Sequence, residues 1–356
     1  MTCPPTSRST ARRAGGRGRP EALPPRVSVV IPNWNGERFL RLCLGSLRDQ
    51  SFQDFETVLV DNGSTDGSMA FAEEHFPEVN VVPLGENRGT AAAFNAGIEA
   101  SETEYVVLLN NDTEQDPGWL EALVRAAEDR PESGLFASKL VDFNDRRVLD
   151  GAGDAMRLSG LPYRLGHGER DGVRFDKPGY VFGACAAAAL YRKSTLDEVG
   201  LFDEDFVSYC EDGDLSFRAQ LAGYRCFYVP GAVVYHMGSA STGGKRSPTA
   251  TRLGSRNSFS LLVKNLPLSA VPHILPFFVA GQLGRLITAA ATGTLRAHLE
   301  GLVGAWRHLP LMLGKRAEIQ KGKKLSDAEV RRLLRESSLA ATASIARRLG
   351  DRAVSR

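Results

Sequence analysis

Short apolar runs alternate with helical patterns over the first third of the sequence, and this alternation constrains the fold more than any other feature. The apolar runs are rich in Val, Ile and Leu, and they occupy residues 27–31, 56–61, 79–83 and 105–112. Segments with helical periodicity lie between them, at about 36–50, 66–75 and 90–100, and a further helix is expected to begin near Pro117. Continuous apolar runs indicate strands that are buried on both faces. The pattern therefore predicts an α/β fold with a mostly parallel sheet flanked by helices.

The alternation stops near residue 135. Glycine-rich sequence over 151–183 predicts loops and short strands. Helices are expected at about 194–198 and 212–222, and RCFYVPGAVVYH (225–236) predicts a last strand. We divide the chain into a basic tail at 1–25, an α/β domain at 26–255 and a helical basic extension at 256–356. The tail is rich in Arg, Pro, Gly and Ser, which predicts disorder.

The net charge of +2 conceals an uneven distribution. Residues 1–26 carry six arginines and one glutamate, and residues 285–356 carry fifteen Lys or Arg and six Asp or Glu, so the stretch between them is acidic. Basic ends suggest an anionic surface as their partner, such as a membrane, and we expect no nucleic-acid partner. Five cysteines without a CxxC spacing indicate free thiols in a reducing compartment, here the cytoplasm.

Polar clusters follow three of the predicted strands, at Asn33–Asn35, Asp61–Ser64 and Asn110–Asp112. Ligands of parallel sheets bind beyond the carboxyl ends of the strands, where these clusters must lie. Helix capping would explain any one cluster, but three successive ones favour a ligand site.

The residue types suggest roles at that edge. An aspartate with neighbouring amide oxygens, as in LLNND, suits Mg²⁺ or Mn²⁺, although an Asx turn is an equal alternative. Asp61 can accept a hydrogen bond from a ligand N–H, and Asp66 is expected to cap the next helix. In ENRGTAAAFNAG, a helix N-terminus beside Asn87 and Arg88 suits an anionic ligand. Tight helix–sheet packing would explain Ala91–Ala93 well, but not Asn87 and Arg88.

YCEDGDLSFR (209–218) places three carboxylates, Glu211, Asp212 and Asp214, within four positions. Capping of the next helix would explain one of them but not all three. In a semi-buried site the acids would raise one another's pKa values, as a general base requires. His236 follows the last predicted strand, where a metal-binding role competes with a structural one.

Five collinear motifs resemble the family-2 glycosyltransferases of the GT-A fold, and most closely their rhamnosyltransferase-like branch. The motifs are VSVVIPNWNG, VLVDNGSTDGS, ENRGTAAAFNAG, LLNNDT and the long stretch from VGLFDEDF to VVYHMGS. The resemblance runs from about 27 to 242 and continues loosely to about 325. It implies a nucleoside-diphosphate-sugar donor, inversion at the anomeric carbon and a divalent cation, Mg²⁺ or Mn²⁺.

The resemblance also assigns roles to individual residues. Donor binding falls to Pro32, Asn33, Asp61, Asn87, Arg88, Asn110 and Asn111. Asp112 and His236 would hold the metal, in a motif whose first position is asparagine where many relatives have aspartate. Asp212 would be the general base, supported by Glu211. Phe182, Gly183 and Ala184 fall where family members contact the acceptor.

The basic extension combines apolar and cationic residues. Leu295, Leu299, Leu302, Val303 and Trp306 share one helical face, and GKRAEIQKGKK follows soon after. This combination is typical of a helix lying on an anionic membrane. A helical subdomain packed on the core, or a dimer face, is the alternative. Residues 265–284 are uncharged but contain three prolines and two glycines, which favours a re-entrant or interfacial segment over a transmembrane helix.

The favoured function is transfer of rhamnose, from a dTDP or UDP donor, to a saccharide or lipid-linked saccharide of the cell envelope. Alternatives are another sugar, a secondary-metabolite acceptor, or a non-catalytic subunit that binds sugar nucleotides. A nucleotidyltransferase is disfavoured because a Gly-rich phosphate loop is not evident. The expected location is the cytoplasm, including the cytoplasmic face of the membrane; oligomeric state is left open.

Overall fold

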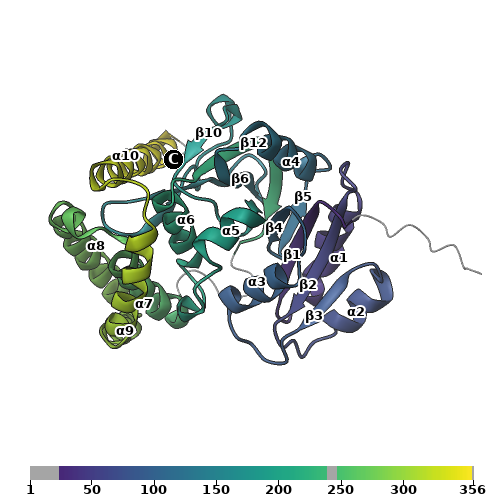
Figure 1. The fold of residues 1–356 in the computed structure, drawn as a ribbon, viewed down its shortest axis with the longest axis horizontal. Helices are drawn as coiled ribbons and strands as arrows, with labels where there is room; N and C mark the ends of the chain where they lie inside the picture. The colour runs from purple at the N-terminus through teal and green to yellow at the C-terminus, as the bar shows by residue number, and fades with distance from the viewer. Residues whose placement is uncertain (1–23, 239–246, 355–356) are drawn as a thin grey trace, which may run out of the picture.

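A ten-stranded sheet forms the centre of the computed structural model, which describes residues 24–238 and 247–354 (Figure 1). Its strands are β1 (Val27–Asn33), β2 (Phe55–Asp61), β3 (Asn80–Pro83), β4 (Tyr105–Leu109), β5 (Thr113–Gln115), β6 (Ser133–Asp142), β7 (Leu149–Ala152), β10 (Gly179–Val181), β11 (Ala188–Arg192) and β12 (Arg225–His236). The main path runs β10-β12-β6-β11-β4-β1-β2-β3, with β5 beside β12 and β7 beside β6. A separate hairpin pairs β8 (Asp154–Met156) with β9 (Pro162–Arg164).

The sheet is parallel where the sequence predicts it and mixed elsewhere. β4, β1, β2 and β3 are mutually parallel, and so are β6 and β12. β11 lies between these two groups and is antiparallel to both β4 and β6. The sequence pattern did not predict β6 or β11. Alanine is a poor strand former, and β11 begins with Ala188 and Ala189 of the alanine-rich run 184–189, so its strand character comes from its place between two strands.

Helices cover both faces of the sheet. They are α1 (Glu37–Arg48), α2 (Ser68–His75), α3 (Thr90–Glu99), α4 (Trp119–Asp129), α5 (Lys193–Val199), α6 (Glu211–Leu221), α7 (Pro248–Asn265), α8 (Val271–Ala291), α9 (Leu295–Gly322) and α10 (Asp327–Val354). Short 3₁₀ turns are η1 (Val173–Asp176), η2 (Glu204–Phe206) and η3 (Leu268–Ala270). The predicted apolar face of α1 is buried with α4 in one core, and α3, α5 and α6 share the core of the other face.

Helix α3 lies unusually close to the sheet. A Cβ on Gly97 would stand 2.1 Å from Val30 Cγ1, so only glycine permits this approach. The buried Ala91–Ala93 on the same helix confirm the tight-packing alternative for this segment. Helix α3 is therefore fixed firmly against β1 and β2.

The C-terminal helices gather at the end of the molecule opposite β3 and α2 (Figure 1). A third core joins α6 to α7–α10 through Phe217, Leu261, Met312 and Leu334. Helix α6 thus packs against the sheet on one side and against the extension on the other. The predicted basic tail lies outside the described residues.

Helix α8 is continuous despite its prolines. Pro272 lies in the first turn and only Pro276 is internal, so the prolines do not interrupt the helix as the sequence suggested. Among the described residues, Leu268–Ala291 is the one helical segment long and apolar enough to cross a membrane, and 11% of its most apolar window is buried. The predicted apolar face of α9 is exposed, with Trp306 67% accessible, while its opposite face packs on α7.

Candidate active site

Asn33, at the end of β1, joins the ends of neighbouring strands. Its Oδ1 accepts a hydrogen bond from Asn111 Nδ2 (2.7 Å), and its Nδ2 donates to Ser68 Oγ (3.0 Å). A Cβ on Gly36 would lie 2.2 Å from Asn111 Nδ2, so the turn after β1 also depends on glycine. The predicted clusters do meet at this edge, and Asn33 and Asn111 are buried there in contact with each other.

Asp61 ends β2, directly beside Asn33 in the sheet register. Its Oδ1 accepts a hydrogen bond from Ser64 N (3.0 Å), which holds the carboxylate at the turn that follows the strand. Pro32 lies one position earlier in β1, opposite Val60. Asp66 caps the start of α2 as predicted, because its Oδ1 accepts from Ser68 N (3.1 Å).

Asn62, which the sequence analysis did not single out, fixes the loop that carries Asn87 and Arg88. Its Oδ1 accepts from Arg88 N (2.9 Å), and its Nδ2 donates to Gly89 O (3.2 Å) and Asn87 Oδ1 (3.3 Å). The Arg88 guanidinium forms an ion pair with Glu204 (3.2 Å). The predicted donor residues Asn87 and Arg88 therefore sit on a loop that is anchored to the end of β2.

The N-terminus of α3 is largely capped within the chain. Ala91 N donates to Val207 O (3.1 Å), and Thr90 N donates to Ser208 Oγ (3.3 Å). These amides are the groups that an anion would need at a free helix N-terminus. The expectation that this terminus itself binds an anion is not supported, because the loop at 207–208 already occupies it.

Asp112 and His236 meet where β5 pairs with the end of β12, and Asp150 of β7 completes a cluster. His236 Nε2 lies 3.3 Å from Asp112 Oδ1, and His236 Nδ1 lies 2.7 Å from Asp150 Oδ2. Asp150 also contacts His167 Nδ1 (3.1 Å) and pairs with Arg164. We call Asp112, Asp150 and His236 the metal-side cluster. Asp150 is the member that sequence analysis missed.

The metal-side cluster fits a divalent cation. His236 Nε2 is buried and has no hydrogen-bond partner of acceptable geometry among the described residues, although the Asp112 carboxylate faces it. Asp150 is placed to accept the Nδ1 proton, which would leave the Nε2 lone pair directed at the space beside Asp112. Burial lowers the pKa of His236, but the hydrogen bonds and charges of Asp112 and Asp150 raise it by a larger amount. The pKa of His236 is therefore above its ordinary value. A cation would replace the proton that these carboxylates attract.

Asp212 lies in the first turn of α6, where it meets Asp154 of β8 and Cys185. One ligand-type atom from each of these three side chains lies within 4.8 Å of the others. Arg164 of β9 approaches the same group, with its Nη2 2.7 Å from Cys185 Sγ. We call Asp154, Glu211 and Asp212 the base-side cluster. Asp154 and Arg164 come from the glycine-rich stretch that could not be interpreted from sequence.

The electrostatics of the base-side cluster favour proton uptake. Burial raises the pKa of Asp212, and the positive charge of Arg164 offsets only part of this effect. Burial and the Asp212 charge raise the pKa values of both Asp154 and Glu211. Glu211 Oε2 is buried without a hydrogen-bond partner among the described residues. The predicted rise in pKa is thus present for Glu211 and Asp212.

Asp214, the third acid of this stretch, behaves oppositely. Its side chain is fully buried and accepts hydrogen bonds from Arg218 Nε (2.9 Å), Lys264 Nζ (2.7 Å) and Asn265 Nδ2 (2.7 Å). Burial raises the pKa of Asp214, but Lys264 and Arg218 lower it to about 2. The expectation that all three acids form one group with raised pKa values is therefore wrong for Asp214, which joins α6 to α7.

The loop before α6 has a strained backbone. Val207, Tyr209 and Cys210 all have positive φ angles, of 64°, 69° and 70°. Such conformations are costly for residues other than glycine, especially a β-branched one. Asn257 of α7 stabilises the loop, because its Nδ2 lies within 2.9 Å of the carbonyl oxygens of Phe206, Ser208 and Tyr209. Helix α7 thus helps to position Asp212.

The predicted acceptor residues lie next to the base-side cluster. Gly183 and Asp154 exchange backbone hydrogen bonds of 2.8 and 3.1 Å. Phe182 is buried and its ring meets the edge of Phe217 (5.4 Å between centroids), and Ala184 is fully buried. The side chain of Phe182 therefore belongs to the core, and this segment borders the cluster through its backbone.

The strand order, the two clusters at the carboxyl edge and the capping helices define a GT-A fold. Among solved structures, a mannosyltransferase from Pyrobaculum calidifontis, in complex with GDP-Man and Mn²⁺, matches with a TM-score of 0.51 and 20% identity. That match covers 84% of this chain and 86% of the other. It supports the same fold.

The family model for glycosyl transferase family 2 matches residues 28–200. The N-acetylglucosaminyl-diphospho-decaprenol L-rhamnosyltransferase of Mycobacterium tuberculosis is 31% identical over 248 residues, which is 63% of this chain and 78% of that protein. The pre-mycofactocin glycosyltransferase of the same species is 31% identical over 281 residues, 75% of this chain and 56% of that protein. The chain belongs to the family-2 glycosyltransferases and resembles their rhamnosyltransferases.

Proposed function

We propose that this chain is an inverting glycosyltransferase that moves a sugar, with rhamnose favoured, from a nucleoside-diphosphate-sugar to a lipid-linked saccharide or a growing cell-envelope polysaccharide. The observation that carries the proposal is the pairing of two acidic clusters at one sheet edge, joined by Arg164. The mycobacterial rhamnosyltransferase supports rhamnose, and its name supports a diphospho-prenol-linked acceptor. We favour dTDP-rhamnose as the donor.

The donor would lie along the edge formed by β1, β2 and β4. Asp61 would accept a hydrogen bond from the nucleotide base, with Pro32 beside it. The anchored loop of Asn87 and Arg88 would face the ribose and diphosphate. The donor site would also be lined by Asn110, Asn111 and Asn33. The neighbouring positions of Asn33 and Asp61 at the ends of β1 and β2 support this division.

Asp112 and His236 would hold a divalent cation, Mg²⁺ or Mn²⁺, with Asp150 orienting the imidazole. Such a cation stabilises the negative charge that develops on a leaving diphosphate. The Mn²⁺ in the structure of the Pyrobaculum mannosyltransferase supports this assignment.

Asp212 would accept the proton of the acceptor hydroxyl as its oxygen attacks the anomeric carbon and the nucleoside diphosphate departs. A carboxylate with a raised pKa is suited to this proton transfer, which contributes about 10²–10⁴ in rate. Glu211, whose pKa is raised to about 8, would support Asp212 from the adjacent position, and the backbone at Phe182, Gly183 and Ala184 would border the acceptor. The enzyme would work in the cytoplasm, at the inner face of the membrane.

The test is release of nucleoside diphosphate by the purified chain from dTDP-, UDP- and GDP-sugars, with Mg²⁺, Mn²⁺ or EDTA. Assays run with a prenyl-diphosphate-linked N-acetylglucosamine acceptor and without it. We expect metal-dependent release from dTDP-rhamnose that increases with acceptor and is lost in Asp212→Asn. Asp49→Asn, the same change at an exposed position, should retain activity. Donor binding without release under any condition would favour a non-catalytic subunit instead.

A further inference from the structure

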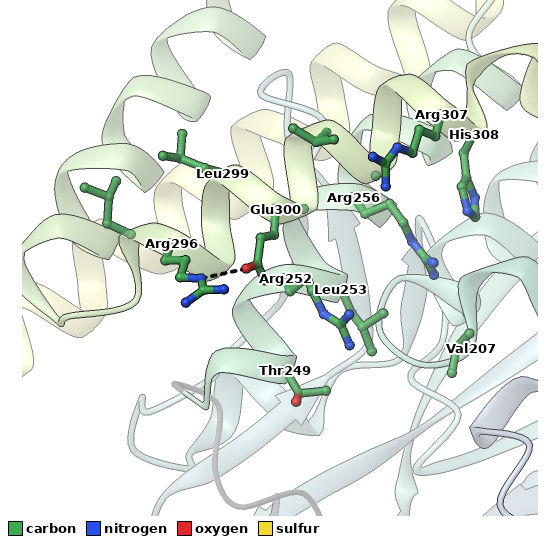
Figure 2. Close-up of a pocket in the computed structure, with 14 residues that line it drawn as sticks. Val207, Thr249, Arg252, Leu253, Arg256, Arg296, Leu299, Glu300, Arg307 and His308 are labelled. Atoms are coloured by element: carbon green, nitrogen blue, oxygen red, sulfur yellow. Dashed lines mark hydrogen bonds and ion pairs between the residues drawn. The ribbon is translucent and has the colours of Figure 1, made fainter.

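A groove between α7 and α9 gathers positive charge close to the loop that precedes α6. Its volume is about 1260 Å³. Arg252 and Arg256 from α7 and Arg307 and His308 from α9 line the same space (Figure 2). A fourth arginine, Arg296, pairs with Glu300 (2.9 Å), the one carboxylate among the lining residues. The groove therefore has an excess of cations.

Neighbouring acids offset the charge of these cations only in part, through Asp205 near Arg256 and His308. Within the described part of the chain, Arg252 and Arg307 form no ion pair, and Arg256 is held by the carbonyl oxygens of Asp205 (2.7 Å) and Phe206 (3.0 Å). Burial and the charge of Arg252 lower the pKa of Arg256, and burial and the charge of Arg256 lower the pKa of His308. Such mutual repulsion in a concave site indicates a place for an anion, and arginine is well suited to phosphate.

One wall of the groove is apolar. Leu295, Leu299 and Val303 follow one another at four-residue spacing along α9, and each is at least one-third exposed. Trp306 continues this line, and its ring meets Phe259 of α7, which also meets Phe278 of α8 (6.0 Å between centroids in both pairs). A run of exposed apolar side chains then extends along α8: Leu275, Phe277, Val279, Leu283 and Ile287. An apolar surface of this extent marks a site for a partner protein, a membrane or an apolar ligand.

The groove is connected directly to the base-side cluster. Val207 lines it, while the carbonyl of the same residue caps α3 through Ala91 N. Arg256 and Asn257 hold the strained loop whose next residues are Glu211 and Asp212. A group anchored in the groove is thus separated from the general base by one short loop.

We propose that this groove binds the diphosphate of a prenyl-diphosphate-linked acceptor, with Arg252, Arg256 and Arg307 on the phosphates and the prenyl chain along the apolar faces of α9 and α8. The inference rests on the proposed function and names the part of the acceptor that this surface recognises. An anionic headgroup alone would pair with the arginines but leave the apolar side chains of α8 and α9 exposed. Hydrocarbon alone would cover those side chains but leave the arginines unpaired. Only an amphiphile that carries both groups uses the charge and the adjoining apolar wall together.

The test is binding of farnesyl diphosphate to the full chain, followed by calorimetry, in the absence of any donor sugar. We expect Arg252→Ala/Arg307→Ala to weaken binding about tenfold or more, because two charge-assisted contacts are lost. Arg332→Ala/Arg335→Ala removes the same charge from exposed positions on α10 and should change the affinity less than about twofold. Leu299→Ser/Val303→Ser should weaken farnesyl diphosphate binding while leaving the weaker binding of inorganic diphosphate unchanged. Thermal unfolding confirms that each variant is folded.

Equal affinity of the wild type and the folded groove variant for farnesyl diphosphate would overturn the proposal. Binding of phosphatidylglycerol vesicles through the same arginines, with farnesyl diphosphate failing to bind, would also overturn it and make the groove a headgroup site. The result is independent of turnover, since Asp212→Asn should bind farnesyl diphosphate like the wild type. If farnesyl diphosphate binds in the groove but no sugar is transferred to any acceptor, the proposed function is wrong. If sugar is transferred but farnesyl diphosphate does not bind in the groove, the groove proposal is wrong.

Discussion

The metal-side and base-side clusters are both buried and acidic, yet they hold their protons differently. Asp150 is surrounded by Arg164, His167 and His236, and these partners outweigh burial and hold its pKa well below the ordinary range. Burial raises the pKa values of Asp212 and Asp154, the Asp212 charge raises that of Asp154 further, and the charge of Arg164 offsets only part of these effects. Burial alone therefore does not decide the charge of a carboxylate. The hydrogen-bond donors and cations around the carboxylate also determine whether it is ionised.

Arg164 accounts for much of this difference. It pairs directly with Asp150 but influences Asp154 and Asp212 only through its charge. Arg164 thus helps to keep Asp150 of the metal-side cluster ionised, while the carboxylates of the base-side cluster can still accept a proton.

Replacing Asp212 by Asn should lower kcat by about 10²–10⁴, because the general base is lost while the side-chain volume is retained. The KM for the donor should change little, since no predicted donor residue belongs to the base-side cluster. Steady-state kinetics with saturating metal measures both quantities. If Asp212→Asn loses donor binding but keeps its kcat, Asp212 binds the donor and is not the general base.

Replacing Lys264 by Met should destabilise the fold by about 3–5 kcal/mol, because Asp214 would keep a buried charge without its main partner. Urea unfolding measures the change. The control is Lys321→Met, which removes an exposed ion pair with Glu318 (2.8 Å) and should cost less than about 1 kcal/mol. Equal costs for the two variants would mean that Asp214 is not the structural acid of this helical turn.

Replacing Asp150 by Asn should weaken Mn²⁺ binding about 10- to 100-fold, because His236 loses the acceptor that orients it. Calorimetry with Mn²⁺ in the presence of nucleoside diphosphate measures the affinity without turnover. Asp145→Asn, at a more exposed aspartate paired with Arg147, should bind Mn²⁺ like the wild type. Unchanged affinity in Asp150→Asn would exclude Asp150 from the metal-side cluster.

The acidic limb of kcat/KM should lie above the usual carboxylic acid range of about 4, because the unprotonated base is the active form and its pKa is raised. Activity should therefore fall as the pH decreases through this raised pKa. Asp154→Asn should leave the limb in place, because Asp154 has a pKa of about 8 and is already protonated when Asp212 takes up its proton. pH profiles at saturating Mn²⁺ measure both values. A limb that moves to lower pH in Asp154→Asn would show instead that Asp154 is still ionised when Asp212 takes up its proton.

The sheet edge where the donor is proposed to bind could be predicted, because short sequence motifs at the strand ends indicate it. Each of β1, β2 and β4 ends in a short polar motif, and parallel pairing necessarily brings Asn33, Asp61 and Asn111 to one edge. The cap at Asp66 and the buried face of α1 follow equally local rules. Family resemblance added roles for these residues but was not needed to bring them together.

The base-side cluster could not be assembled in the same way. β8 and β9 have three residues each, too few for a periodic pattern, so neither Asp154 nor Arg164 gave a signal. Asp214 was misjudged because its partner Lys264 lies 50 residues away on α7. Asp150 was missed for a related reason: only pairing between β6 and β7 brings it near His236.

Burial of α6 on both sides has a consequence for how this enzyme could be redesigned. A helix enclosed by two cores cannot be displaced without disturbing both, so the carboxylate at its start is a fixed reference point. New acceptors must then be accommodated by reshaping what surrounds that point. We expect substitutions on the exposed side of α7 and α9 to broaden or narrow acceptor choice while the chemistry stays intact, and substitutions within α6 to be poorly tolerated.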